Sequence, residues 1–180
     1  MTSTSLAIGL PLAALMLLAA VSDLLTRRIP NVLTVVGMVA APVIWAVVGG
    51  PSMALASLVG AALAFVVGAA LFAAGALGGG DAKLLTVAGA FLGPARLVPA
   101  LLAIGIAGGI LALVVALWRG QIFGTLVRVW HLSLHIGTLG RRGASHALGS
   151  ADAITVPYAV AIAAGSLATW FALSSDVLAR

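Results

Sequence analysis

The fold of this chain depends on residues 84–118, LLTVAGAFLGPARLVPALLAIGIAGGILALVVALW, which contain one charged residue, Arg96. Gly93-Pro94 favours a turn and divides the stretch into a short apolar run, 84–92, and a longer one, 97–118. A membrane-spanning helix needs roughly 17–25 apolar residues, so the longer run is a candidate span and the shorter one is marginal. Whether the short run 84–92 crosses the membrane decides the topology.

The whole chain has the composition of a polytopic membrane protein. Of its 180 residues, 63% are hydrophobic and only 7% are charged, whereas a soluble domain carries about 25% charged residues. So few charges cannot cover a water-facing surface, so we expect one membrane-embedded domain over residues 1–180. The other candidate spans are 6–22, 32–48, 53–77 and 153–173.

The basic residues indicate how the spans are oriented. Lys and Arg concentrate in cytoplasmic loops, and here they follow the first span, at Arg27 and Arg28, and recur in the segment 119–150. The net charge of +5 is therefore interpreted as a topology signal and not as a nucleic-acid surface. An even number of crossings must lie between Lys83 and Arg119, which two helices hinged at Pro94 supply.

The sequence thus predicts an all-α membrane bundle of about six transmembrane helices with both termini outside. Residues 1–5 lack the basic n-region of a signal peptide, so 6–22 is expected to be a retained first span. Small residues at helix-packing spacing, Gly60 with Ala64 and Gly105 with Gly109, favour close helix contacts in lipid.

The segment 119–150 is expected to be cytoplasmic or interfacial. Its polar residues recur at steps of three and four, which fits either an amphipathic helix on the inner membrane surface or the solvated face of a connecting helix. His131 and His135 are one turn apart but lack the glutamate of a zinc-protease helix. The chain has neither cysteine nor glutamate, and two histidines alone are a weak metal site, so no metal is predicted; no cofactor is predicted either.

The chain has four acidic residues, all aspartates: Asp23, Asp81, Asp152 and Asp176. The topology places Asp23 and Asp81 at the same membrane face. Taken singly, Asp81 fits a helix N-cap and Asp23 fits an ion pair with Arg27. Together they form a carboxylate pair, the smallest set of groups that can hydrolyse a peptide with one ionised and one protonated member.

Three segments resemble the type 4 prepilin peptidase family of membrane aspartyl proteases. The stretch 23–31, DLLTRRIPN, is similar to the first family motif, and 78–84, GGGDAKL, to its Gly-x-Gly-Asp-x-Lys motif. The stretch 157–165, PYAVAIAAG, resembles the signature of the last span. It departs from that signature at Ala159 and Val160, where the family has Gly-Pro, a change expected to affect packing rather than chemistry.

The resemblance implies an endopeptidase of the cytoplasmic (inner) membrane of a prokaryote, with Asp23 and Asp81 as the catalytic pair. Its partners would be membrane lipids and prepilins or pilin-like precursors, cut at the cytoplasmic face just before their hydrophobic segment. The short chain looks most like the peptidases of Flp (tight adherence) pili. It lacks the paired Cys-x-x-Cys associated with N-methylation, so that activity is not expected.

The other motif residues have physical roles that we also predict. Gly78 and Gly80 keep bulk away from the Asp81 side chain. Pro30 starts the second span, which Asn31 helps to cap. Lys83 draws Asp81 toward its ionised form or holds a lipid phosphate.

Two other functions fit parts of the sequence. A small multi-pass transporter or a scaffold of a secretion machine would suit the broken helix pair around Pro94, but such proteins show ionisable groups at mid-membrane. A presenilin-like peptidase that cuts leftover signal peptides would share only Gly-x-Gly-Asp. The sequence leaves the oligomeric state open.

The predicted topology can be tested with reporter fusions. Reporters near Arg27, Lys83 and Arg142 should be cytoplasmic, and reporters near Pro51 and Arg96 external, because basic loops stay inside. An external reporter at Arg142 would mean that residues 84–118 cross once.

Overall fold

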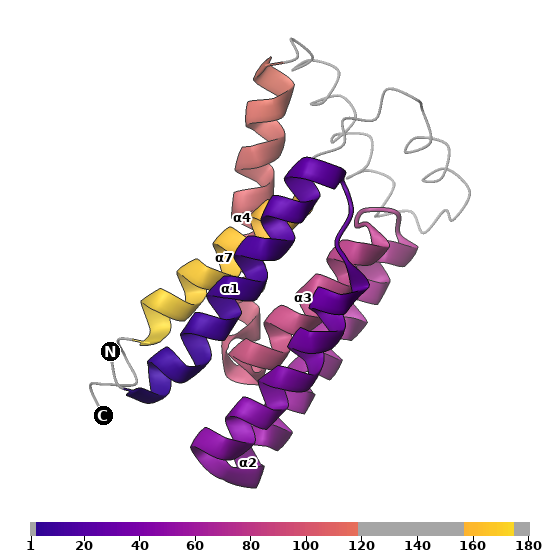
Figure 1. The fold of residues 1–180 in the computed structure, drawn as a ribbon. Helices are drawn as coiled ribbons and strands as arrows, with labels where there is room; N and C mark the ends of the chain where they lie inside the picture. Colours follow the sequence, from indigo (N-terminus) through magenta and orange to yellow (C-terminus); the bar gives the residue numbers. More distant parts are fainter. Residues whose placement is uncertain (1–2, 119–156, 175–180) are drawn as a thin grey trace.

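The structure is a computed structural model that describes residues 3–118 and 157–174, and every element in these ranges is an α-helix (Figure 1). The helices are α1 (Ser3–Thr26), α2 (Asn31–Ala73), α3 (Gly79–Leu92), α4 (Pro94–Trp118) and α7 (Tyr158–Ser174). The predicted all-α class is confirmed for this part of the chain. The predicted interfacial segment 119–150 lies outside the described residues.

Helix α2 folds back on itself at Gly50, where the predicted turn lies. Gly50 has φ 79° and is followed by Pro51, so the helix breaks at a residue that tolerates the left-handed region. The two halves are here called the first arm (residues 31–49) and the second arm (residues 51–73). The first arm begins, and the second arm ends, near the start of α3 (Figure 1). Asn31 of the first arm contacts Lys83, and Gly68 of the second arm lies against Ala82.

Two predicted boundaries next to α3 were wrong. The second arm ends at Ala73 and not at residue 77, because the chain turns at Gly75 with φ 74°. Helix α3 begins at Gly79, before the predicted apolar run 84–92. It therefore includes the polar residues Asp81 and Lys83, which lie ahead of that run. Its far end agrees with the predicted hinge, since α3 stops at Leu92 and Gly93 has φ 73° before α4 starts at Pro94.

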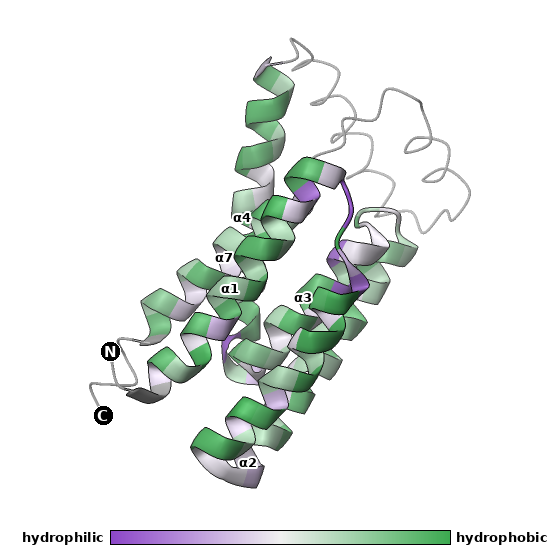
Figure 2. Cartoon of the chain, viewed as in Figure 1, coloured by the Kyte–Doolittle hydropathy of each residue, from purple (hydrophilic) through white to green (hydrophobic). Residues whose placement is uncertain are grey.

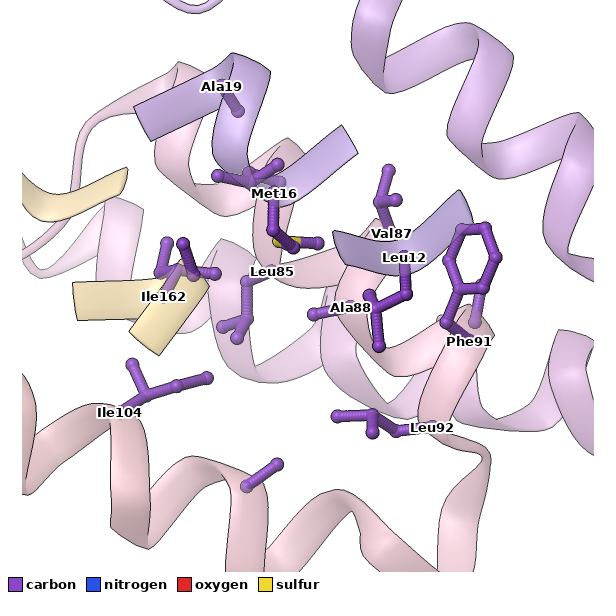
Figure 3. Close-up of a cluster of buried hydrophobic side chains, with 14 of the residues drawn as sticks. Leu12, Met16, Ala19, Leu85, Val87, Ala88, Phe91, Leu92, Ile104 and Ile162 are labelled. Carbon is purple, nitrogen blue, oxygen red and sulfur yellow. The ribbon is translucent and has the colours of Figure 1, made fainter. Parts of the chain in front are cut away.

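Helix α3 lies at the centre of the bundle. Every residue from 84 to 92 is buried, and the 14-residue helix is about 21 Å long, shorter than the roughly 30 Å hydrocarbon core of a bilayer. Figure 3 shows its side chains Leu85, Ala88 and Leu92 among residues of α1, α4 and α7. Protein contacts and not lipid therefore surround this short helix.

Glycines allow α2 and α3 to approach each other closely. A Cβ atom on Gly60 would collide with the carbonyl oxygen of Gly89, and one on Gly89 with the side chain of Ala64. The predicted packing role of Gly60 and Ala64 is thus confirmed. Gly105 and Gly109 show no such contact, since no group of the described residues lies within 4 Å of a Cβ placed on either one.

The bundle exposes many large apolar side chains, as a membrane helical bundle requires, and most of the ribbon is coloured hydrophobic (Figure 2). Three described helices, α1, α2 and α4, are long and apolar enough to cross a membrane, and α2 contains two arms. After α3, helix α4 runs back so that its last turn lies toward the same end of the bundle as the last turn of α1 (Figure 1). The count of six spans remains a prediction.

The glycine contact generates a stability prediction. Gly60→Ala should lower the free energy of unfolding by about 1–3 kcal/mol, because the added methyl meets backbone atoms that cannot rotate away. Thermal unfolding of the purified protein in detergent measures this. Gly105→Ala is the matched control and should change stability by less than about 0.5 kcal/mol; equal losses in the two variants would contradict the close approach.

Candidate active site

The buried face of α1 carries Asp23 into the bundle. Ile8, Leu12, Met16 and Ala19 are each no more than 1% exposed, and they recur at steps of three and four as on one helix face. Asp23 follows Ala19 by four residues and is 9% exposed. The core stripe of α1 therefore ends in a carboxylate.

A tight turn follows this aspartate. The backbone N–H of Arg27 donates to the carbonyl of Asp23 at 2.9 Å, and Arg27 has φ 54°, a conformation that is uncommon for a residue with a side chain. The hydroxyl of Ser22 donates to the carbonyl of Arg28 at 2.8 Å. The turn brings Ile29 against the start of α3, where a Cβ on Gly80 would lie 3.4 Å from the Ile29 Cβ.

Asp81 is the third residue of α3 and not its N-cap, as one interpretation of the sequence had it. The N-cap is Gly78, and its backbone N–H donates to the Asp81 carboxyl group. A Cβ on Gly78 would lie 2.8 Å from Asp81 Oδ2. Position 78 thus needs glycine, because a side chain there would collide with the carboxyl group that its backbone approaches. This agrees with the prediction that Gly78 keeps bulk away from Asp81.

Asn31 and Lys83 connect the two motifs. Lys83 Nζ donates to Asn31 Oδ1 at 2.9 Å. The predicted capping role of Asn31 was wrong, because α2 begins after Pro30 as N-cap and no side chain caps it. The Asn31 amide is instead turned toward α3, so this hydrogen bond fixes the first arm of α2 against the first turn of α3.

The two aspartates and their neighbours line one cavity of about 360 Å³ at the end of the bundle where α1 finishes and α3 begins. Of the predicted site residues, only Pro30 does not line it. The lining consists of Asp23, Arg27, Arg28, Ile29, Asn31, Gly78, Gly79, Gly80, Asp81 and Lys83. Figure 2 shows the hydrophilic colour concentrated along these segments.

The surroundings of Asp81 in the cavity raise the pKa of its carboxyl group. Asp81 lies in the polar first turn of α3, ahead of the apolar run 84–92. Burial raises the pKa of Asp81 to about 6, and the nearby Asp23 carboxylate adds to the rise, whereas the hydrogen bond from Gly78 opposes it. Asp81 therefore keeps its proton to a higher pH than an ordinary aspartate.

Asp23 has a neighbour that the sequence did not reveal. The backbone N–H of Ala159, in the first turn of α7, donates to Asp23 Oδ2 at 3.4 Å. The N-terminus of α7 thus faces the Asp23 carboxyl group. The sequence pointed to this stretch through Pro157-Tyr158, but a backbone donor leaves no trace in side-chain identity, and Ala159 was assigned to packing alone.

The geometry places two carboxyl groups from different helices in one polar cavity. In the described ranges no group of three His, Cys, Asp or Glu residues could hold a metal ion. His131, His135, Asp152 and Asp176 lie outside the described residues.

Comparison with known proteins gives the family. A search of curated proteins and a search of solved structures each found no match. A sequence model of the type IV leader peptidase family matches residues 10–113, which is more than half of the chain and contains both aspartate motifs. The chain therefore belongs to the type IV leader peptidase family and is a membrane protease of the leader peptidase type.

Proposed function

We propose that the protein removes the leader peptide of prepilins or pilin-like precursors at the cytoplasmic face of the membrane, with Asp23 and Asp81 as an aspartyl dyad. The observation that carries this proposal is the shared cavity: two carboxyl groups 58 positions apart in sequence, from different helices, line one polar space, and Asp23 raises the pKa of Asp81. The family membership supports cleavage of a leader.

The surroundings of the two aspartates assign their roles. Asp23, next to the N-terminus of α7, acts as the base and takes a proton from water. The resulting hydroxide attacks the scissile carbonyl carbon while Asp81 gives its proton to the carbonyl oxygen. When the tetrahedral intermediate collapses, the proton on Asp23 passes to the leaving amine and Asp81 regains its own, so the dyad returns to its starting state.

The position of the cavity suits a substrate with a polar and an apolar part. The cavity has three basic side chains, Arg27, Arg28 and Lys83, along its lining, and the helices that lead away from it are coloured mostly hydrophobic (Figure 2). A precursor whose polar leader meets its hydrophobic segment at the membrane surface would present the junction there. We assign the protein to the Flp type and to a prokaryotic inner membrane, without N-methylation.

The alternative, a transporter or scaffold, has less support. Transport sites place ionisable groups near mid-membrane. In the described part of the chain, Asp23, Asp81 and Arg96 all lie within the first or last turns of their helices. The ionisable groups are thus arranged at the ends of the bundle, as the peptidase requires.

Removal of either carboxyl group should abolish cleavage. Asp23→Asn and Asp81→Asn should each reduce kcat/KM for a Flp-type prepilin by at least about 100-fold, the usual contribution of a general acid or base. Mass spectrometry of the co-expressed precursor measures leader removal and shows the new N-terminus. Asp152→Asn and Asp176→Asn are the controls and should retain most activity; substantial cleavage by either dyad variant would refute the assignment.

The dyad should give a bell-shaped dependence of rate on pH. Asp81 holds its proton below about pH 6 and loses it above, so cleavage should fall about tenfold per pH unit on the alkaline side. A dyad that shares one proton also loses activity in acid, where a second proton binds, and the two steps belong to the pair. The test is a pH–rate profile with a soluble leader peptide in detergent, and a flat profile with chemistry rate-limiting would contradict a shared proton.

A further inference from the structure

A second concave surface adjoins the catalytic cavity. It is an open groove of about 520 Å³, here called the α2–α3 groove, and it shares Asn31 and Lys83 with the cavity that holds the dyad. Its other lining residues come from both arms of α2 and from α3: Thr34, Val35, Met38, Val39, Phe65 and Thr86. A chain that leaves the dyad past Lys83 therefore enters this groove.

The groove follows a helix. Five of its lining residues, at positions 31, 34, 35, 38 and 39, lie at steps of three and four along the first arm, which makes one continuous face of about 12 Å. Thr34 and Thr86 form its buried floor, at 4% and 5% exposed. Val35, Val39 and Phe65 form its rim and are 60–61% exposed, so the groove opens on the apolar outer surface of the bundle.

The floor of the groove offers no free hydroxyl group. Thr34 Oγ1 donates to the carbonyl of Asn31 and Thr86 Oγ1 to the carbonyl of Ala82, each at 2.9 Å. Both hydroxyls are thus satisfied within their own helices, and below Asn31 and Lys83 the groove presents methyl, methylene and aromatic groups. An occupant needs no hydrogen-bonding side chains there.

The chemistry of the groove identifies the occupant. A peptide at membrane depth must satisfy its backbone hydrogen bonds internally, which only a helix does in a single segment. Because lipid tails are as apolar as the groove, selection there depends on shape and packing. The occupant is therefore an apolar helix that enters sideways from the lipid, with its polar end held at Asn31 and Lys83.

We propose that the α2–α3 groove binds the apolar helix that follows the scissile bond of the substrate, so that helix docking sets which bond reaches the dyad. This proposal rests on the proposed leader-peptidase function and adds a recognition site to it.

The first test compares two substrates in phospholipid vesicles: a full-length Flp-type prepilin and a soluble peptide with only its leader and the first turn of its mature part. Val35→Trp and Val39→Trp fill the groove from its exposed rim, so the fold should be retained. Each should raise KM for the prepilin about tenfold, which corresponds to about 1.4 kcal/mol of lost binding, and leave cleavage of the short peptide unchanged.

Val36→Trp is the matched control. Val36 is the same residue type at the same depth of the first arm, is 51% exposed and does not line the groove, so this variant should resemble the wild type with both substrates. Unchanged prepilin cleavage by Val39→Trp, or an equal loss in Val36→Trp, would refute helix binding in the groove. Neither outcome would refute the proposed peptidase activity. Failure of the wild type to cleave either substrate would refute the proposed function instead.

A second test does not depend on cleavage. Because the chain has no cysteine, Val39→Cys and Val36→Cys each introduce a unique thiol, here combined with Asp81→Asn. With a prepilin carrying one cysteine in the first turns of its apolar helix, oxidation should cross-link Val39→Cys and not Val36→Cys. Equal cross-linking at both positions, none at Val39→Cys, or a Val39→Cys homodimer in place of the prepilin adduct would overturn the proposal.

Discussion

The close contact between α3 and the two arms of α2 is the constraint on which the rest of the structure depends. Gly60 and Gly89 bring the backbones together where any side chain would intervene, and the hydrogen bond from Ser57 to the carbonyl of Ala90 lies in the same contact. In lipid the hydrophobic effect does not drive helices together, so such packing and hydrogen bonding must do so. This contact fixes α3, and with it the position of Asp81.

The cavity that holds the two aspartates forms where three helices start or finish. Helix α1 ends in a turn that carries Asp23 inward, α3 begins with glycines that leave room around Asp81, and α7 begins with a backbone N–H directed at Asp23. Each carboxyl group thus accepts a hydrogen bond from a backbone N–H at a helix start, Asp81 from Gly78 and Asp23 from Ala159. At Asp81 burial outweighs this hydrogen bond, so the pKa of its carboxyl group is raised.

The polar cavity and the apolar α2–α3 groove share two lining residues. Lys83 and Asn31 join the first arm of α2 to α3 at 2.9 Å and border both the charged cavity and the α2–α3 groove. A protease that acts where a polar leader meets an apolar helix needs both surfaces side by side. Because the two motif residues sit at the boundary, any shift of α3 against α2 would alter both surfaces together.

The sequence by itself determined the class of the molecule, the turn at Gly50, the hinge at Gly93-Pro94 and the placing of Asp23 and Asp81 at one end, because hydropathy and glycine–proline turns are local properties. Only the tertiary structure decided the partners: Asn31 with Lys83 instead of a helix cap, Asp81 as the third helical residue, and Ala159 beside Asp23. These contacts join residues 52 and 136 positions apart or involve backbone donors, which no side-chain pattern records. They exist because the start of α3, the end of α1 and the start of α7 come together at one end of the bundle.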